Sequence, residues 1–539
     1  MHTVTTQTMI AVPSIVSQIE SLLTTAMTKA FGTGLWPTLI QQANKQTDAD
    51  FQSNAALPLA KKLKLAPHHI AEHILAHIPD NSIIEYCEVS GPGFINITLK
   101  KAFITTMLMS LLKSPDAGII PSKHPETIVV DYGSPNVAKA MHVGHLRSTI
   151  IGDSVVRLLS AKGHHVIRQN HVGDWGTQFG MLIEHIIQQG IDLVNLHDIK
   201  VLNTLYQASK KRFDDDPHFM LAAKQRVVLL QRGDKQTLDL WQSLVLKSQQ
   251  HFQSIYRQLG VLLTEDDIKG ESSYNDDLPK LISDLKGKGL LKESQGAQVL
   301  FLAGFVDKDK NPLPLLLQKS DGGYLYATTD MVTARYRIDV LKAGRIIYVV
   351  DCRQRQHFEM LFAALKHCGF ADEKTRLDYL PFGAILGEDR KPFKTRSGQV
   401  IELEALINEA IKRAYDLYKT KNPNAPDDHA QSIAQVIGIS ALKYADLSND
   451  KIKDIVFDWE QMLSFDGNTA PYLLNAYVRI ASIRRKNGDT SPDSAILLDS
   501  ESELALAKHL IQFPELIDQL SGDLAIHRLC HFLHQTATL

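Results

Sequence analysis

The sequence predicts a multi-domain α/β protein whose core is a doubly wound parallel sheet, and three observations predict it. With 539 residues, the chain exceeds what one hydrophobic core usually supports, so about three domains are expected. From Thr127 onward, apolar strand-like runs alternate with helical stretches, as they do in parallel sheets covered by helices. Beyond the turn-rich segment Asn422–Asp428, the apolar spacing is helical. We expect an N-terminal α+β domain at 1–122, a core domain at 123–420, and a C-terminal α-helical bundle at 421–539.

Four apolar runs predict the strands of the core sheet: Ile128–Tyr132, His165–Asn170, Ile346–Asp351 and Leu377–Phe382. Ligands of such sheets bind beyond the carboxyl ends of the strands, so the loops that follow these runs form the candidate site. The glycine-rich loop Asn170–Gly180 follows the second run, and we expect it to line the same crevice as the first loop. An insertion at about 185–320 interrupts the alternation and reads as mostly solvated helices with apolar stripes.

The two flanking regions show different patterns. In residues 1–122, helical spacing at Ile15–Phe31 precedes alternating runs at Ile83–Val89 and Phe94–Leu99, which predict a hairpin. This region contains no nucleotide motif, and on pattern alone it is a packing appendage. Helical spacing in the last region, for example at Ile433–Leu442, predicts the bundle.

Composition favours an ordinary globular protein of a reducing compartment. The formal net charge is -2, so no global basic field indicates nucleic acid, and any RNA contact must come from local patches. The four cysteines form no C-x-x-C pair, which excludes a zinc cage or disulfide framework of that spacing. The sequence shows neither a secretory signal pattern nor an apolar run long enough to span a membrane. We expect a cytoplasmic protein without membrane contact.

The first candidate site is His142-Val143-Gly144-His145, where a helix is predicted to begin after the first strand. Unpaired N–H groups and the helix dipole favour phosphate at a helix N-terminus, and both imidazoles can add donors. Gly144 leaves room for a ligand to approach the backbone. The natural ligand is a nucleotide, which makes the sheet a nucleotide-binding core. A chance pair of surface histidines is the alternative.

The second candidate site combines Tyr326, Asp330 and Gln354. If a helix begins near Tyr326, Tyr326 and Asp330 lie one turn apart on one face. A carboxylate pairs well with a guanidinium group, and the Tyr326 ring can cover such a cation. Gln354 offers neutral donor and acceptor groups, and Asn136 can hold the polar end of the substrate. The alternative is an ordinary helix start with an aspartate and a buried tyrosine.

The third candidate site is the loop Gly387–Gly398, which follows the last predicted strand. Its cations include Lys391, Lys394 and Arg396, and a mobile basic loop suits a polyphosphate that must be bound and then released. A basic surface turn is the alternative. No pattern in the sequence indicates a tightly bound metal or an organic cofactor, and we expect neither.

These motifs together resemble the class I aminoacyl-tRNA synthetases. The His142–His145 stretch resembles their first signature, and Ser134-Pro135-Asn136 with Lys139 resembles the arginyl member. The loop around Lys394 resembles the second signature but departs from the usual Lys-Met-Ser-Lys-Ser form, and Lys139 looks like the compensating cation. The resemblance implies catalytic roles for His142, His145, Lys139 and Lys394, and ATP contacts from Gly144, Lys391 and Arg396. It implies arginine contacts from Ser134, Asn136, Tyr326, Asp330 and Gln354.

The flanking regions carry the same resemblance. Asp50–Ala55 and Gly91–Ile97 resemble the N-terminal domain of arginyl-tRNA synthetases, which contacts the outer corner of the tRNA, and the insertion would face the acceptor arm. The helical region resembles their anticodon-binding bundle, with base-stacking candidates at Tyr472, Tyr477, Arg479 and Arg485. An amphipathic core helix is the alternative there. The family usually continues past the helix at Leu529–Leu533, so we expect a shortened bundle with weaker tRNA affinity or poorer solubility.

The resemblance implies an arginine–tRNA ligase. The arginine carboxylate would attack the α-phosphate of ATP, and Mg²⁺, Lys139 and the basic loop would neutralise the departing pyrophosphate. Arginine would then pass to the 3′-terminal ribose of tRNA(Arg), and this family often needs bound tRNA before activation. The expected partners are tRNA(Arg), L-arginine and ATP, with no DNA, for a monomeric protein. The alternatives are a synthetase for another cationic amino acid, such as lysine, and a non-catalytic tRNA-binding paralogue.

Overall fold

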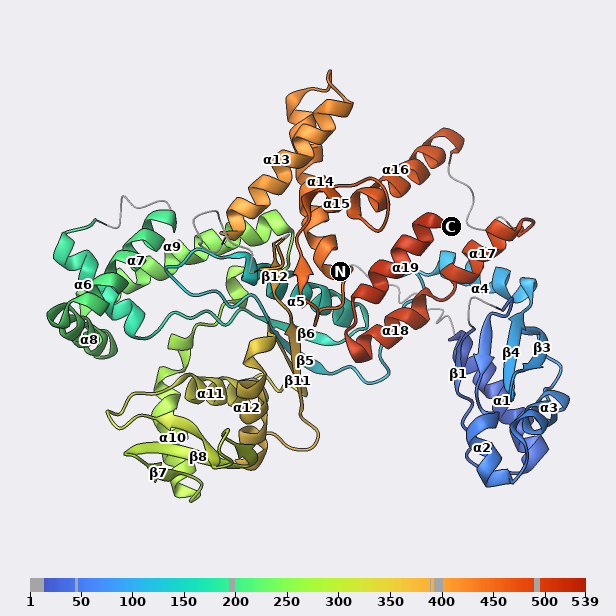
Figure 1. The fold of residues 1–539 in the computed structure, drawn as a ribbon, viewed down its shortest axis with the longest axis horizontal. Coiled ribbons are helices and arrows are strands. Elements are labelled where there is room, and N and C mark those ends of the chain that lie inside the picture. Colours follow the sequence, from blue (N-terminus) through green and yellow to red (C-terminus); the bar gives the residue numbers. More distant parts are fainter. Residues whose placement is uncertain (1–13, 44–46, 193–198, 388, 392–400, 489–494) are drawn as a thin grey trace, which may run out of the picture. The chain divides into compact units, whose positions relative to one another are not determined.

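The computed structural model describes residues 14–43, 47–192, 199–387, 389–391, 401–488 and 495–539. The chain forms two compact units (Figure 1). One comprises Met1–Ser122, Asn475–Leu524 and His531–Leu539, and the other comprises Lys123–Leu474 and Ala525–Cys530. Among the residues described, no helix combines the length and the apolar character needed to cross a membrane.

The core of the larger unit is a four-stranded sheet, which confirms the predicted fold class. Its strands are β5 (Thr127–Asp131), β6 (His165–Gln169), β10 (Arg345–Asp351) and β11 (Arg376–Phe382). All three pairings are parallel, and the spatial order is β11-β10-β5-β6. The chain runs outward from β5 to β6 and then returns to β10 on the other side of β5. The strand order therefore reverses beside β5, where such sheets bind their ligands.

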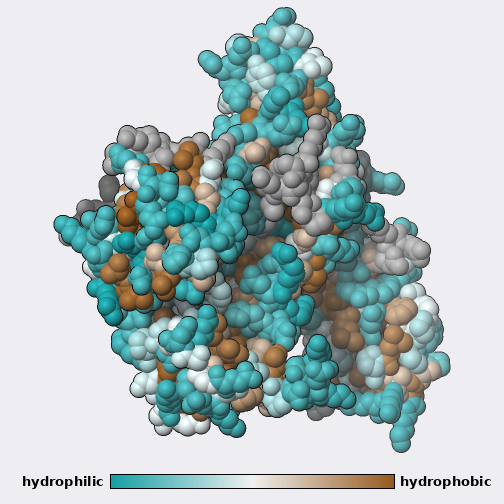
Figure 2. Space-filling model, turned by 60° about the vertical axis from the view of Figure 1, so that its left-hand side comes forward, coloured by the Kyte–Doolittle hydropathy of each residue, from teal (hydrophilic) through white to brown (hydrophobic). Residues whose placement is uncertain are grey.

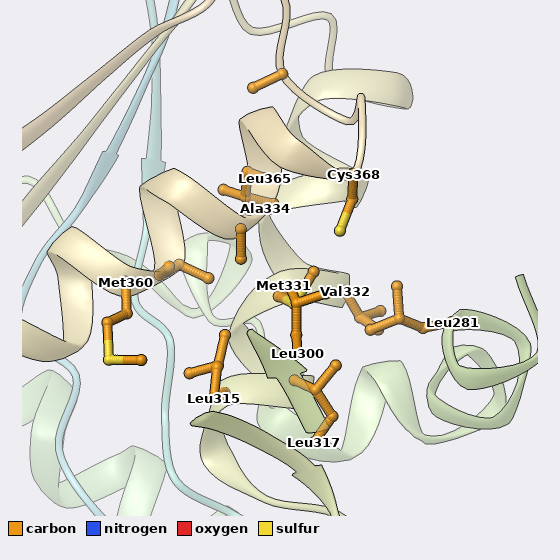
Figure 3. Close-up of a cluster of buried hydrophobic side chains, with 14 of the residues drawn as sticks. Leu281, Leu300, Leu315, Leu317, Met331, Val332, Ala334, Met360, Leu365 and Cys368 are labelled. Atoms are coloured by element: carbon orange, nitrogen blue, oxygen red, sulfur yellow. The ribbon is translucent and has the colours of Figure 1, made fainter. Parts of the chain in front are cut away.

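Helices on this sheet begin beside the candidate loops. Helix α5 (Val143–Ala161) follows β5, α11 (Tyr326–Asp339) precedes β10, and α12 (Arg355–His367) follows it. Between β6 and α11 lie the helices of the insertion: α6 (Thr177–Gln189), α7 (Ile199–Asp215), α8 (Pro217–Gln231), α9 (Lys235–Leu259) and α10 (Leu278–Gly287). Buried apolar side chains of α10, α11 and α12 form one cluster, including Leu281, Met331 and Leu365 (Figure 3).

The predicted insertion is not wholly helical. Most of it is helical, as expected, but it also contains a three-stranded antiparallel sheet of β7 (Lys292–Ser294), β8 (Ala297–Val306) and β9 (Pro312–Gln318), which the sequence patterns did not indicate. Prolines within β9 and irregular register in β8 obscure the period-two pattern. Leu300, Leu315 and Leu317 of this sheet join the apolar cluster under α11 (Figure 3). The sheet thereby supports the helix that starts at Tyr326.

The remaining part of the larger unit carries α13 (Leu403–Lys421), α14 (Asp427–Leu447) and α15 (Trp459–Met462), and α16 (Ala470–Asn487) begins there. The expectation of helices alone after residue 421 was wrong at β13 (Ile455–Val456), which pairs in parallel with β12 (Ile385–Leu386). A buried ion pair joins Arg147 of α5 to Asp446 of α14, with Nη2 and Oδ1 2.9 Å apart. Helix α5 is therefore held to the first helices beyond the sheet domain.

The smaller unit contains an antiparallel sheet of order β1-β2-β4-β3 with helices packed against it. The elements are α1 (Ile15–Phe31), β1 (Ile40–Gln42), β2 (Phe51–Ser53), α2 (Ala56–Leu63), α3 (Pro67–Ala76), β3 (Ile84–Ser90), β4 (Phe94–Leu99) and α4 (Lys101–Lys113). The predicted hairpin is confirmed by the β3–β4 pairing. Ala507 of α17 (Glu501–Leu510) joins the same core. Helices α18 (Phe513–Asp523) and α19 (His527–Thr538) complete the chain.

The surface is mixed in polarity. Figure 2 shows a mostly hydrophilic face with several separate apolar patches. Exposed large apolar side chains are correspondingly spread over many elements, including α8, α14 and α16. Single exposed apolar residues are normal in globular proteins, so this face does not by itself indicate a site.

Candidate active site

The loop after β5 is held in an unusual backbone conformation. Ser134 and Ala138 have φ values of 46° and 63°, in the left-handed region that such residues rarely occupy. Hydrogen bonds fix this loop: Ser134 N donates to Asn170 Oδ1 at 2.9 Å, and Ser134 Oγ donates to Asp131 Oδ1 at 3.0 Å. Rare backbone conformations persist where the surroundings over-determine them, and they cluster at binding sites.

The two histidines of the first motif lie at the N-terminus of helix α5, as predicted, and they also cap it. Gly144 N donates to His142 Nδ1 at 3.1 Å, and His142 N donates to His145 Nδ1 at 3.0 Å. Because each Nδ1 accepts a hydrogen bond, the proton of each neutral ring is assigned to Nε2. A Cβ at Gly144 would lie 2.9 Å from His142 Cε1, so only glycine leaves this cap undisturbed. The cap thus orders two Nε2–H donors.

Both histidines are held neutral. Burial, with a smaller contribution from the neighbouring His142, lowers the pKa of His145 to about 3. Burial, Arg353 and Lys139 lower the pKa of His142. At neutral pH the two rings can therefore donate hydrogen bonds without carrying a charge, and Lys139 and Arg353 place positive charge near His142.

The loop after β6 lies beside the loop after β5, as expected. Gly173 N donates to Pro135 O at 3.1 Å, and Val137 N donates to Gly173 O at 3.0 Å, so the two loops run side by side. A Cβ at Gly173 would lie 2.4 Å from Asn136 Oδ1, and glycine is required for this close approach. Asn136 is exposed at this edge. The contact brings Ser134 and Asn136 to the reversal point of the sheet.

The second candidate group gathers at the start of α11. The helix begins at Tyr326, so Tyr326 and Asp330 lie one turn apart, as the sequence predicted. Tyr326 is 77% exposed, and Gln354 is exposed immediately before α12. Asp330 Oδ2 lies 2.6 Å from Nε2 of His357, and this bond raises the pKa of His357. Sequence reasoning missed His357, which meets Asp330 only because α11 and α12 pack together.

Two further carboxylates accompany Asp330. Burial, with smaller contributions from Asp330 and Asp174, raises the pKa of Glu271 to about 8. Asp174 accepts hydrogen bonds from Ser272 N at 2.8 Å and Ser272 Oγ at 2.7 Å. Glu271 was missed because it belongs to an irregular 3-10 turn (Glu271–Asp277) with no periodic signal. This concentration of carboxylates favours a cationic ligand.

A buried arginine joins the two halves of the crevice. Arg337 of α11 is fully buried, and its Nη2 lies 2.7 Å from Asp131 Oδ2 at the end of β5. Its Nε donates to Gln169 Oε1 at 2.6 Å, at the end of β6. Asp131 also accepts a hydrogen bond from Ser134. Helix α11 is therefore connected through Arg337 and Asp131 to the loop that follows β5.

The basic loop is only partly described. Lys391 is exposed in a turn closed by Gly387 N donating to Lys391 O at 2.9 Å. Lys394 and Arg396 lie outside the described residues. Lys139 is half-buried and close enough to His142 to lower the pKa of that ring. Among the described residues, no group of three or more His, Cys, Asp or Glu side chains is arranged to hold a metal ion.

The four predicted tRNA contacts all belong to α16. Tyr472 is half-buried, whereas Tyr477, Arg479 and Arg485 are exposed. Tyr477 and Arg479 are two positions apart, which turns them by about 200° around the helix. These two side chains therefore point to different sides of α16.

Three family models match consecutive parts of the chain. The model described as "Arginyl tRNA synthetase N terminal domain" matches residues 17–99. The model "tRNA synthetases class I (R), catalytic domain" matches residues 107–459, and "DALR anticodon binding domain" matches residues 473–539. The largest match includes every described residue of the crevice.

Whole-chain comparisons agree. The chain is 46% identical over 505 residues to an arginine–tRNA ligase of Psychromonas ingrahamii, covering 93% of this chain and 86% of that protein. It is 47% identical over 507 residues to one from Cellvibrio japonicus, covering 93% and 87%. The structure of arginyl-tRNA synthetase from Plasmodium falciparum matches with a TM-score of 0.83 at 31% identity, covering 97% of this chain and 91% of that one. The Thermus thermophilus structure, at 22% identity and a TM-score of 0.77, supports the fold, covering 97% and 90%.

Proposed function

The chain belongs to the arginyl-tRNA synthetases, and we propose how its crevice activates L-arginine with ATP and passes it to tRNA. Its activity is that of an arginine–tRNA ligase. The assignment of its residues rests on one observation: a group of neutral hydrogen-bond donors and a group of carboxylates lie beside β5. A neutral histidine pair caps α5, and a group of carboxylates lies at the start of α11.

The phosphate end supplies hydrogen bonds and charge. The arginine carboxylate attacks the α-phosphorus of ATP, and the bond to pyrophosphate breaks. Nε2–H of His142 and His145 donates to oxygens that gain negative charge in the transition state, so these bonds strengthen as the reaction proceeds. Gly144 lets the nucleotide approach the backbone. No side-chain nucleophile takes part.

Cations neutralise the leaving group. Lys139 and the loop residues Lys391, Lys394 and Arg396 bind the pyrophosphate oxygens, and Mg²⁺ accompanies ATP as part of the substrate. The support for Lys139 is its position beside His142. Activated arginine then passes to the 3′-terminal ribose of the tRNA.

The other end binds the substrate amino acid. Asp330 and Glu271 bind the guanidinium group, Tyr326 covers it, and Gln354 adds a neutral contact. Ser134 and Asn136 hold the polar end near the phosphate. Arginine binding draws Asp330 from its bond with His357, whose pKa is already raised by that carboxylate.

The flanking parts complete the proposal. We propose three domains, divided at 122/123 and 420/421, and the order of the three matched family models supports their order along the chain. Tyr472, Tyr477, Arg479 and Arg485 contact tRNA from α16, which carries both aromatic and basic side chains. We place the protein in the cytoplasm as a monomer that binds neither DNA nor membranes, and its four free cysteines support a reducing compartment.

The deciding experiment is ATP–pyrophosphate exchange in the presence of tRNA(Arg), with arginine compared with lysine. We expect exchange with arginine and a kcat/KM at least about 1,000-fold lower with lysine, because an ammonium group leaves buried acceptors unpaired. Preference for lysine would favour a synthetase of different specificity. Retained tRNA binding without exchange would favour a non-catalytic paralogue.

A further inference from the structure

Tyr206 extends from the insertion toward the ammonium group of Lys139. Its ring centroid lies 4.5 Å from Lys139 Nζ, within the range of cation–π attraction. Tyr206 lies within α7 (Figure 1) and also packs against the apolar cluster of Met181, Phe219 and Ala223. The insertion therefore contacts the phosphate side of the crevice through this ring.

The surroundings of Lys139 give this contact its significance. Lys139 lies in the same loop as Ser134, three positions before His142, and its charge helps to lower the pKa of His142. Within the described part of the chain, no carboxylate lies within ion-pair distance of its ammonium group. A carboxylate partner would cancel most of the positive charge that a phosphate needs, whereas a neutral ring restrains the ammonium and leaves its charge in place.

We propose that Tyr206 is a positioning residue that holds the Lys139 ammonium group beside the phosphate site. This rests on the role of Lys139 in the proposed function. Lysine has a flexible side chain that loses rotamer freedom when it binds a ligand. Because the ring already confines the ammonium group, the lysine side chain loses less conformational entropy when ATP binds. The N–H donors that point away from the ring remain available for phosphate oxygens. The insertion thereby sets the efficiency of the ATP half of the reaction.

Tyr206 has a second neighbour, Tyr326, and an effect through Tyr326 must be distinguished from an effect through Lys139. Although Tyr326 is exposed, partial desolvation of its hydroxyl, Glu271 and Tyr206 raise its pKa. Tyr206 is therefore also near the arginine end of the crevice. Action through Lys139 changes the kinetics of ATP, whereas action through Tyr326 changes the KM of arginine.

The test compares Tyr206→Leu, Tyr206→Phe and Phe213→Leu in arginine-dependent ATP–pyrophosphate exchange with saturating tRNA. Phe213 is a matched control, because it lies on α7, packs in the same cluster and places its ring 5.7 Å from the remote Lys210. Loss of the ring at 206 should lower kcat/KM for ATP about tenfold, the equivalent of a partly desolvated cation–π contact. Tyr206→Phe and Phe213→Leu should stay within about twofold of the parent enzyme, since both keep the ring at 206.

The same substitutions in a Lys139→Ala background identify the partner. Tyr206→Leu should add no further loss there, because the group that it positions is absent. A full additional loss, an equal loss in Phe213→Leu, or a raised KM of arginine would overturn the proposal. If the parent enzyme shows exchange and Lys139→Ala has no effect, the assigned role of Lys139 fails and this proposal with it. A parent enzyme without exchange would instead refute the proposed function.

Discussion

Individual residues of the crevice act through protonation states that their surroundings impose. His142 and His145 accept hydrogen bonds from backbone N–H groups at Nδ1. In each neutral ring the proton is therefore on Nε2, and that nitrogen is a hydrogen-bond donor. Burial favours that neutral form by lowering both pKa values. The pair is therefore ready to bind developing charge across the physiological pH range.

We expect His145→Ala to lower kcat for arginine activation about 100-fold, the usual effect of removing one donor to a transition-state oxygen. The KM of arginine and the affinity for tRNA should change little, because neither ligand is assigned to this ring. His165→Ala is the control, since that residue is exposed at the start of β6, the opposite end of the strand from the crevice. Equal loss of activation and tRNA binding would contradict the assignment.

Glu271 gives a pH dependence of its own. Its pKa in the free protein is raised to about 8, so this carboxyl is mostly protonated at pH 7. A bound guanidinium favours the carboxylate, and arginine binding must then release a proton. The KM of arginine should fall as pH rises from 6.5 toward 8 and then level off.

Glu271→Gln should flatten this pH dependence, because the amide does not titrate. The pKa of His357 is raised by its bond to Asp330, so the variant His357→Gln separates the contribution of this histidine from that of Glu271. An unchanged slope in Glu271→Gln would show that Glu271 does not contact the substrate.

The residues that sequence could predict are those within contiguous motifs. His142, Gly144 and His145 occupy four positions at a helix start, so spacing and helix physics suffice. Glu271 and His357 lie in other segments, and only the packing of α11 with its neighbours brings them to Asp330. Nothing in their local spacing indicates that meeting.

At the scale of elements, the ion pair of Arg337 and Asp131 fastens α11 to β5. Both side chains are buried, and a buried charge without its partner is strongly unfavourable. We expect Arg337→Met to lower the free energy of unfolding by about 3–5 kcal/mol, measured by urea denaturation. Arg335→Met on the same helix should cost at most about 1 kcal/mol, because its ion pairs are partly exposed.

The double variant Arg337→Met with Asp131→Asn should recover part of this loss, since no buried charge then remains. Equal costs for Arg337→Met and Arg335→Met would contradict a structural role for the buried pair.

Strands and helices could be predicted where the spacing of their apolar residues follows one regular period. All four parallel strands were located from sequence. Strands β5 and β10 are mostly buried, whereas β6 and β11 are only partly buried. Strands β8 and β9 were missed because irregular register and prolines blur their alternation. The short pair β12 and β13 contains too few residues for any pattern to indicate it.

At the scale of the whole molecule, the reversal of strand order beside β5 makes one crevice from distant segments. The nucleotide loop follows β5, the carboxylates come from the insertion and α11, and Gln354 follows β10. Order along the sequence suggested the parallel sheet. The spatial order β11-β10-β5-β6, which fixes the neighbours of the first loop, became clear only from the structure.

The measurement that tests this account most directly is steady-state exchange kinetics of Asp330→Asn, with the KM of arginine and of ATP determined separately. If one crevice holds arginine at its carboxylate end and ATP at its histidine end, the KM of arginine should rise about 100-fold or more. The KM of ATP should stay within about twofold, because Asp330 does not contact the nucleotide. An unchanged KM of arginine, or an equal rise for both substrates, would contradict the account.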